Sequence, residues 1–455
     1  MSTFEVKGNE NYAGVIAEIK TIIPLENCDN IQHTILFGNC VIIGKDVKVG
    51  DKGVYFPSET KLNSKFLSNN NLYRNKELNA DKSKAGFFEE NGRIRCMKFR
   101  GNKSDGFFVP FSFFSCYISD FNSMSVLDES TIFDTINGEN VCEKYFPKNY
   151  HVKDSSSNNN SKVKKNKFKR IIDTQWRFHI DTAQLGRNIH KLELNDVINI
   201  SQKIHGCNVC IGNVLCNKKL SFSERLLKKL KFNIQDKQYE IVYSSRKVIK
   251  NSDINKKANH YYGTDIWGDV CEEVKHLIPK GITLYGEIVG YTKEGKPIQK
   301  NYDYGCNIGE HKFFVYRMTN TNEDGIVTEL PMSYIQAWCK SVGLNGVDVL
   351  YEGSVRELYK DLHNNYCESL DGIDFSTFKP DLFLKMLTDE FLEKKCSVDD
   401  FNVYCNNDVW DEGIVLRKVN TPDIEVYKLK SYNFKLGEAK ELDSGEVNME
   451  DSQEG

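Results

Sequence analysis

The chain has 455 residues, of which 40% are hydrophobic, and this length suits two domains better than one core. Its net charge of -3 excludes a generally basic nucleic-acid coat protein, although a local basic groove is still allowed. The 14 cysteines are scattered, the start MSTFEVKGNENY is polar, and no apolar run is long enough to cross a bilayer. We therefore expect a soluble, reduced, intracellular and cytoplasmic protein without a membrane partner.

The first part of the chain alternates short apolar runs with glycine turns. Such runs lie at residues 13–19, 35–37, 41–44, 47–57 and 92–101, and they predict about five short strands. This pattern suggests a small barrel of the OB kind, a fold that commonly binds single strands or nucleic-acid backbones. We therefore expect an OB-like nucleic-acid-binding domain over residues 1–150.

Basic side chains gather on and beside the last of these predicted strands. They lie near Phe99, Phe107 and Phe108, and such a combination would suit phosphates and a stacking surface. A plain solvated strand face explains them equally well. The cluster consists of Arg93, Arg95, Lys98, Arg100 and Lys103.

Residues 151–170 have no apolar period and are rich in serine, asparagine and lysine, so they predict a flexible basic linker. A second unit follows at residues 171–436. The tail at residues 437–455 is acidic and polar, and we expect it to fray.

Lys203 stands between two apolar, strand-like segments. An ammonium group in such a place must be paired or neutral, which makes Lys203 a candidate nucleophile. Gly206 lets a ligand approach the backbone, and His205 and Asn208 are polar groups able to hold phosphate or ribose oxygens. Taken alone the pattern Lys-x-His-Gly is weak, because surface lysines beside turn glycines are common.

Three polar side chains on other predicted strands also suggest ligand contacts. Arg246 ends a strand and could clamp a phosphate or ribose, although strand-end arginines are usually surface residues. Glu287 lies in the apolar strand 281–290 and needs a hydroxyl group or a cation as partner. Tyr316, on the strand 313–317, could stack on a base, although core packing is the default for such a run.

The rest of the second unit combines helix and strand patterns. Residues 223–230 predict a short helix, and residues 331–400 predict a mostly helical, structural region. Glu412 precedes a glycine and an apolar strand, and so resembles Glu287 in its sequence surroundings. Lys428 and Lys430 face the same side of a strand, which favours a bound anion, although a solvated edge strand would give the same pattern.

The order of these segments resembles that of the covalent nucleotidyltransferase superfamily of polynucleotide ligases and capping enzymes. Ser245-Arg246 fits the arginine-bearing segment between the first and third motifs of that superfamily. The segments similar to its first, third, aromatic, fourth and fifth motifs are Lys-Ile-His-Gly at 203–206, Tyr-Gly-Glu-Ile-Val-Gly at 285–290, Phe-Phe-Val-Tyr at 313–316, Glu-Gly-Ile-Val-Leu-Arg at 412–417 and Lys-Leu-Lys at 428–430.

Finer features resemble one subgroup of RNA ligases. His205 stands where an aspartate is more usual. Together with Asn208, it resembles the residues found at these positions in nick-sealing and editing-type RNA ligases. The lead-in at residues 178–185 and the OB-like unit resemble the subgroup that carries its OB domain first. The sequence departs from the family at Gln202, where an acid is frequent, at Cys207, where a threonine or another small residue is, and at Arg317, where an acid often follows the aromatic.

The resemblance implies an α+β fold, in which an N-terminal OB-like β-barrel precedes a nucleotidyltransferase (ligase adenylation) domain of antiparallel sheets with helices. It implies an ATP-dependent RNA ligase that joins 3′-hydroxyl and 5′-phosphate ends through a lysyl-AMP and an adenylylated 5′ end. The expected cofactors are ATP and Mg²⁺ or Mn²⁺. The expected partner is a nicked duplex of RNA or of RNA and DNA, and we expect a monomer.

The resemblance also implies a role for each site residue. Lys203 would attack the α-phosphate of ATP, while Lys428 and Lys430 neutralise its charge. Glu412 and Glu287 would serve the metal, and Glu287 would also bind the ribose hydroxyl. Further nucleotide contacts are expected from Gln202, His205, Asn208, Arg246 and Tyr316, the last by stacking on adenine.

Three alternatives remain at this stage. A DNA ligase and an mRNA capping guanylyltransferase use the same lysine chemistry. A resemblance to these enzymes predicts an OB domain after the fifth motif, but only about 25 residues follow Lys430, too few for such a domain. A non-catalytic protein that binds nucleic-acid ends would have no reason to retain so many charged residues in its pocket. An active RNA ligase is therefore the favoured hypothesis.

Overall fold

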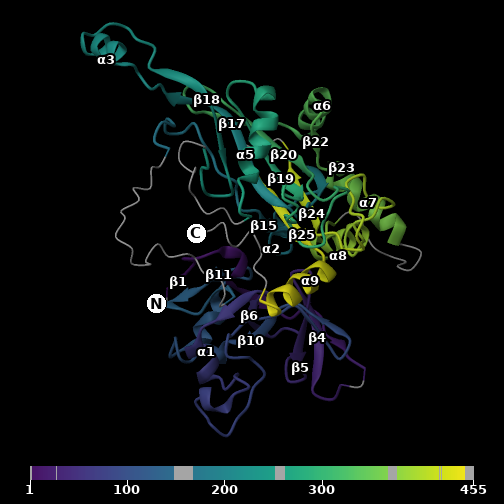
Figure 1. Ribbon diagram of the computed structural model, residues 1–455. Coiled ribbons are helices and arrows are strands. Elements are labelled where there is room, and N and C mark those ends of the chain that lie inside the picture. The colour runs from purple at the N-terminus through teal and green to yellow at the C-terminus, as the bar shows by residue number, and fades with distance from the viewer. Residues whose placement is uncertain are drawn as a thin grey trace.

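The computed structural model describes residues 3–26, 28–147, 168–251, 262–366, 377–419, 421 and 423–445. Most of the predicted linker lies outside these described residues. Within them, no helix combines the length and the apolar character that crossing a membrane requires. The chain is a mixed α and β protein whose N-terminal and C-terminal units lie at opposite ends of the view in Figure 1.

The N-terminal unit is built from small antiparallel sheets. A four-stranded sheet has the order β10 (Phe107–Pro110), β6 (Lys52–Phe56), β2 (Gly14–Glu18) and β11 (Ile132–Phe133). A three-stranded sheet has the order β3 (Ile23–Pro24), β4 (Ile31–Leu36) and β5 (Asn39–Gly44). The shorter ladders join β1 (Phe4–Glu5) with β12 (Thr135–Ile136) and β13 (Glu139–Asn140), β7 (Thr60–Leu62) with β14 (Cys142–Lys144), and β8 (Met97–Phe99) with β9 (Asn102–Ser104).

Two apolar clusters hold this unit together. Four phenylalanines, Phe56, Phe66, Phe114 and Phe133, are fully buried on one side of the four-stranded sheet, with Phe66 contributed by the helix α1 (Ser64–Asn69). A second cluster packs that sheet against β4 and β5. In the described part of the unit no single ladder closes through all these strands, so the predicted OB-like barrel and its boundary at residue 150 stay predictions.

The prediction of a strand at residues 92–101 is wrong for most of these residues. Only β8 is a strand there, because Arg93 turns inward and is 5% exposed. Its guanidinium donates to Glu59 and to Asp443 at 2.7 and 2.8 Å. A guanidinium satisfied in this way is not free to bind phosphate, so the predicted basic cluster is divided between a buried ion pair and an exposed hairpin.

The C-terminal unit contains two larger sheets. The six-stranded sheet has the order β18 (Lys237–Ser244), β17 (Cys207–Asn217), β19 (Ile282–Gly290), β20 (His311–Thr321) and β21 (Val327–Glu329), and β22 (Asn345–Gly346) pairs with β20. The five-stranded sheet has the order β15 (Ala183–Gln184), β25 (Val426–Lys430), β24 (Gly413–Lys418), β16 (Val197–Gln202) and β23 (Val349–Ser354). Lys203 therefore lies between two strands, as the sequence predicts, and the structure shows that these strands belong to different sheets.

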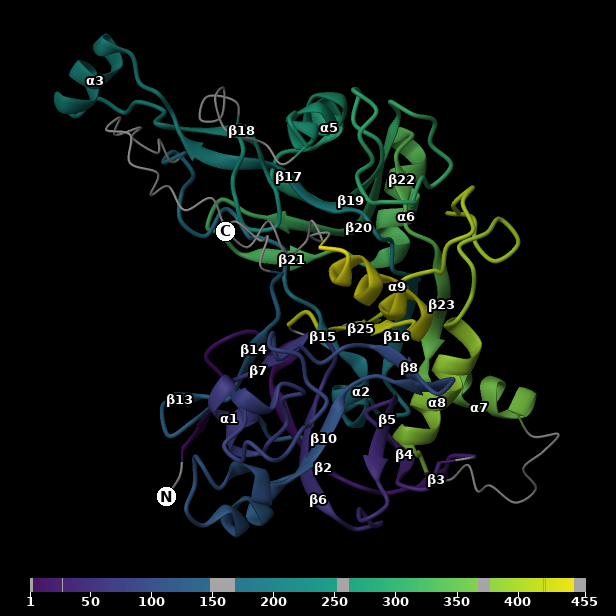
Figure 2. The ribbon, with the colours of Figure 1, turned by 60° about the horizontal axis from the view of Figure 1, so that its bottom comes forward.

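Helices cover the outer faces of both sheets. The helices α5 (Ile266–Val274), which carries Trp267, and α6 (Met332–Val342) contribute buried side chains to the core of the six-stranded sheet. The five-stranded sheet packs on α2 (Leu185–Asn188), α7 (Val355–Tyr366) and α8 (Pro380–Phe391). The predicted helix at residues 223–230 is confirmed as α3 (Phe222–Lys229), which projects from the body in Figures 1 and 2.

The region at residues 331–400 is less helical than predicted. The strands β22 and β23 separate α6 from α7, because both complete sheet ladders: β22 pairs with β20, and β23 pairs with β16. Edge pairing of this kind depends on partners distant in sequence, which a local helical pattern does not reveal.

The predicted tail from residue 437 is wrong for its first residues, because the helix α9 (Tyr432–Asp443) continues through them. Figure 2 shows α9 between the N-terminal strands and the six-stranded sheet. The Tyr432 hydroxyl donates to the Met97 carbonyl oxygen at 2.7 Å, and Lys435 contacts Asn39 and Asp105. α9 thus joins the two units directly after β25.

Candidate active site

A cavity of about 300 Å³ lies between the two sheets of the C-terminal unit. Its walls follow from strand register: Asn199 pairs with Arg417 and Ser201 with Val415, so these side chains share one face of the five-stranded sheet. Lys428 pairs with Val415 and extends the same face. The facing wall, from the six-stranded sheet, contributes Asn208, Glu287, Tyr316 and Arg317.

Lys203, Glu412 and Lys430 form the most highly charged group of this site. The Glu412 side chain is fully buried, and its two carboxylate oxygens lie 2.7 Å from Lys203 Nζ and 2.9 Å from Lys430 Nζ. Both lysine side chains remain partly exposed and line the cavity. The structure thus brings together three predicted site residues from distant segments of the chain.

A glycine conformation positions this carboxylate. Gly413 has φ = +139°, and a Cβ atom there would lie 2.1 Å from the Leu429 carbonyl oxygen. The Lys203 backbone N–H also donates to the Gly413 carbonyl oxygen at 2.8 Å. Because only glycine tolerates this close approach, the pattern Glu-Gly keeps Glu412 and Lys203 adjacent.

His205 lies behind the carboxylate and not among the cavity-lining residues. Its Nδ1 atom is 3.8 Å from Glu412, and its ring packs edge-on against Tyr302 and Phe434. The His205 backbone N–H donates to the Tyr304 hydroxyl at 2.7 Å. The structure therefore places His205 next to Glu412, while its expected nucleotide contact stays a prediction.

Gln202 lines the cavity but uses its side chain for support. Its amide group donates to Asp411 at 2.8 Å and to the Val403 carbonyl oxygen at 3.1 Å. Burial raises the pKa of the Asp411 carboxyl to about 7, although the Gln202 hydrogen bond opposes this shift. An amide in place of the family's frequent acid thus avoids placing a second carboxylate beside Asp411.

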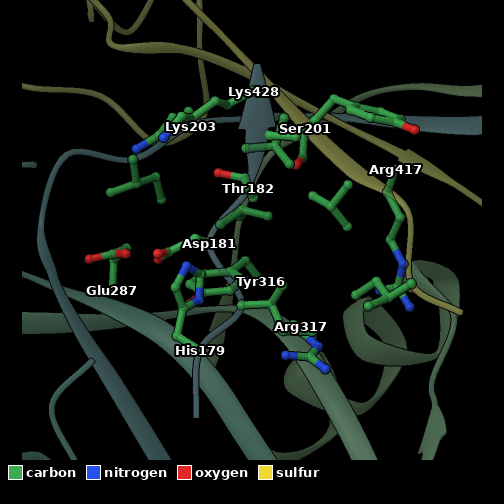
Figure 3. A pocket seen from close by; sticks show the side chains of 18 of the residues that line it. His179, Asp181, Thr182, Ser201, Lys203, Glu287, Tyr316, Arg317, Arg417 and Lys428 are labelled. Atoms are coloured by element: carbon green, nitrogen blue, oxygen red, sulfur yellow. The ribbon is translucent and has the colours of Figure 1, made fainter. Parts of the chain in front are cut away.

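Figure 3 shows Glu287, Tyr316 and Arg317 of the facing wall, together with His179 and Asp181 of the lead-in that precedes α2. The Asn208 amide donates to the Tyr316 hydroxyl at 2.6 Å, and that hydroxyl also lies 2.8 Å from His179 Nδ1. Arg246 donates to Asp181 at 2.5 and 3.1 Å. All these side chains line the cavity.

The sequence alone indicates no role for several of the lining residues, including His179, Asp181, Arg317 and Arg417. His179 and Asp181 belong to the lead-in, whose resemblance to a ligase subgroup was the available signal. Arg417 ends the fourth motif, and Arg317 stood out only as a departure from the family. Sequence alone did not show that these four side chains face the cavity.

The carboxylates of the site are suited to a hard cation. In the described part of the chain no three His, Cys, Asp or Glu side chains converge into a complete metal site. Mg²⁺ needs no such cage, because it keeps several waters and usually binds one or two carboxylates together with substrate phosphates. Glu287 lines the cavity, whereas Glu412 is buried between Lys203 and Lys430, so their expected role as ligands of such an ion stays a prediction.

Known RNA ligases are similar to this chain in fold and, over part of its length, in sequence. A search of curated proteins found no match. Among solved structures, a mutant RNA ligase from Naegleria gruberi with AMP and Mn has a TM-score of 0.52 at 14% identity, covering 93% of this chain and 97% of that chain. A second mutant of that ligase, with ATP and Mn, has a TM-score of 0.53 at 16% identity, covering 95% and 99%.

These structural matches show a shared fold. The family model for RNA ligase matches residues 196–430, which is 235 of the 455 residues and includes every one of the predicted motifs from Lys203 to Lys430. The chain belongs to the RNA ligase family.

Proposed function

We propose that this RNA ligase uses ATP to seal breaks with 3′-hydroxyl and 5′-phosphate ends, such as nicks in RNA-containing duplexes. The observation that carries the proposal is the pair of contacts from Glu412 to Lys203 and Lys430 at the edge of a cavity between two sheets. A nucleophilic amine and a neighbouring cation, held in place by a shared carboxylate, suit nucleotidyl transfer to a lysine. The Naegleria gruberi ligase of the same fold has been solved with ATP and Mn.

In the first step, the Lys203 amine, having lost a proton, attacks the α-phosphorus of ATP. A nitrogen–phosphorus bond forms, the bond between the α-phosphorus and its bridging oxygen breaks, and pyrophosphate leaves. Lys428 and Lys430 lie on the wall beside Lys203 and would stabilise the negative charge that builds on the phosphate. Glu287 would bind the ribose hydroxyl, and Tyr316 would contact the base.

In the next two steps the AMP group moves to a 5′-phosphate, and a 3′-hydroxyl then displaces AMP to form the phosphodiester. Arg246 lines the nucleotide cavity and also the smaller cavity that lies between it and the N-terminal unit. This position would allow Arg246 to hold a phosphate of the incoming strand. Asp181, its present partner, would keep the guanidinium oriented until that strand arrives.

A divalent cation, Mg²⁺ or Mn²⁺, would supply charge neutralisation at the phosphates when bound. Glu412 and Glu287 would hold it, largely through water. Glu412 would at the same time keep Lys203 and Lys430 in place, because its two oxygens face one lysine each.

We also infer that residues 1–150 form the OB-like unit that grips the nucleic acid. The exposed β8–β9 hairpin supports this, because it carries the exposed cations Lys98, Arg100 and Lys103, and the Arg100 guanidinium lies over the exposed ring of Phe99. Cations beside an aromatic ring suit a phosphate backbone and an unstacked base. The thirteen described cysteines are free thiols, which supports an intracellular site of action.

The first experiment incubates the purified protein with α-³²P-labelled ATP, or separately GTP, with Mg²⁺ or Mn²⁺, followed by a denaturing gel. A labelled band with ATP is expected in the wild type and in Lys218→Ala, but not in Lys203→Ala. Lys218 is a suitable control because it forms a surface ion pair with Glu224. Nicked duplexes with RNA or DNA strands would then define the substrate.

The other outcomes identify the rival functions. A band with GTP alone would favour a capping enzyme, and sealing of all-DNA nicks in preference to RNA would favour a DNA ligase. The absence of a band with both nucleotides would favour a non-catalytic protein that binds nucleic-acid ends.

A further inference from the structure

Two arginines from different sheets meet at the side of the cavity opposite Lys203 and Lys428, as Figure 3 shows. Arg317 comes from β20 and donates to both oxygens of Glu329, with Nε at 3.0 and 3.1 Å. Arg417 comes from β24 and reaches the same carboxylate at 3.4 Å. Glu329 therefore couples the two sheets at this end of the cavity.

A bulge in β20 is what turns Arg317 toward the cavity. Arg317 pairs with Tyr285, and Val315 pairs with the next residue, Gly286, so Tyr316 is an extra residue in the ladder. In a regular strand Tyr316 and Arg317 would face opposite sides. The bulge puts Arg317 on the face of Tyr285 and Glu287, so both Tyr316 and Arg317 line the cavity.

Arg317 remains charged although it is 6% exposed. Burial alone would lower the pKa of its guanidinium, but the hydrogen bonds to Glu329 and the electrostatic interactions with Tyr285, Glu329 and Tyr316 together raise that pKa. The guanidinium also lies over the Tyr285 ring, 4.3 Å from its centroid. Ring and carboxylate together hold this cation in one orientation.

Three buried polar atoms at this end have no hydrogen-bond partner among the described residues: Nη1 of Arg317, Nη1 of Arg417 and Oδ1 of Asn199. Asn199 is 1% exposed, and its amide nitrogen donates to Glu352 at 3.3 Å, which leaves the oxygen as the available group. Buried polar atoms without partners are costly, so two donors and one acceptor lining the same cavity indicate a ligand that completes them.

The shape and chemistry of this end suit a nucleobase. Apolar side chains of Met332, Val347 and Val415 line the cavity together with the polar atoms. Adenine has apolar faces and, along one edge, an exocyclic amino donor beside a ring-nitrogen acceptor. Guanine has a carbonyl acceptor in place of that amino group, which Asn199 Oδ1 would repel.

We propose that Arg317, Arg417 and Asn199 recognise the base of the nucleotide: the arginines donate to ring-nitrogen acceptors, and Asn199 accepts from the adenine amino group. This inference rests on the proposed use of ATP and adds the residues that select it over other purine nucleotides. Arg317 is a binding residue that this chain has where relatives often have an acid, so the mode of base recognition follows from its own sequence.

The test measures the rate of lysyl-nucleotide formation with three triphosphates: ATP, GTP and purine riboside triphosphate, which lacks the amino group. Wild-type protein is expected to prefer ATP over both others by about tenfold or more. Asn199→Leu, of similar size, should lose most of this preference. Arg317→Met should raise the ATP concentration that gives half-maximal rate by about tenfold or more, with a smaller change in the maximal rate.

Arg225→Met is the matched control, because Arg225 is exposed on α3, away from the cavity, and it should behave as wild type. Thermal unfolding identifies variants that fail to fold. The comparison of ATP with purine riboside triphosphate uses the wild-type protein, so it remains a test even if a variant does not fold. Labelling of Lys203 at equal rates with ATP and purine riboside triphosphate would overturn the inference alone. No labelling with any nucleotide would overturn the proposed function together with it.

Discussion

The Glu412 carboxylate lies 2.7 Å from the Lys203 amino group, at the junction of strands from two different sheets. The same carboxylate is 2.9 Å from Lys430. Since Glu412 is fully buried, its charge is stabilised by these two lysines, and their charges are stabilised by it. Structure and chemistry therefore depend on the same group.

Glu412→Gln keeps the side-chain shape and removes the charge, which leaves two neighbouring cations without their shared anion. We expect the free energy of unfolding to fall by about 3 kcal/mol and lysyl-AMP formation to fall by at least about 100-fold. Urea unfolding and the labelling gel measure the two effects. Wild-type labelling by a folded variant would contradict this role for Glu412.

The conformation of Gly413 gives a second prediction. Gly413→Ala places a Cβ atom against the Leu429 carbonyl oxygen at a φ of +139°. We expect a loss of about 1–3 kcal/mol of unfolding free energy and a fall in adenylation of about 100-fold, because Glu412 and Lys430 move apart.

Gly437→Ala is the matched control for this substitution. Gly437 lies inside α9, and its added Cβ would contact nothing within 4 Å. We expect an increase of about 0.5–1 kcal/mol in unfolding free energy, because alanine favours the helix. A neutral or destabilising result would contradict the helical assignment at this position.

Much of the site follows from sequence because it depends on local patterns. The position of Lys203 between two apolar runs, and the alternation of Lys428 and Lys430 with apolar residues, can be read directly from the local sequence. The inward turn of Arg93 cannot be read in this way, because its partner Asp443 is 350 residues away. The sequence also does not predict α9, because its buried residues, Tyr432, Phe434 and Ala439, do not form the regular apolar stripe of an amphipathic helix.

The bulge at Tyr316 shows why side-chain direction is harder to predict than strand position. The strand at residues 313–317 was predicted correctly, and period-two alternation would have placed Arg317 opposite Tyr316. One extra residue in the ladder reverses the face of everything beyond it. Register is set by β19, so the direction of Arg317 requires the folded sheet.

The exposed β8–β9 hairpin gives a prediction about nucleic-acid binding. Lys98→Ala combined with Arg100→Ala removes two exposed cations and should leave adenylation of Lys203 unchanged. Binding of a nicked RNA duplex should weaken, and the slope of log affinity against log salt should fall by about two. Fluorescence anisotropy at several salt concentrations measures both. An unchanged slope would exclude these side chains from the phosphate contacts.

The contact between Arg93 and α9 gives the last prediction. The Arg93 side chain is 1% exposed and bridges Glu59 of the N-terminal unit and Asp443 of α9. Arg93→Met should lower the free energy of unfolding by about 3 kcal/mol, because it leaves two carboxylates without their shared cation. Arg95 contacts the same Asp443 at 3.4 Å but is 34% exposed, so Arg95→Met should cost less than about 1 kcal/mol. Urea unfolding compares the two variants, and equal losses would show that burial of Arg93 does not stabilise the junction between the units.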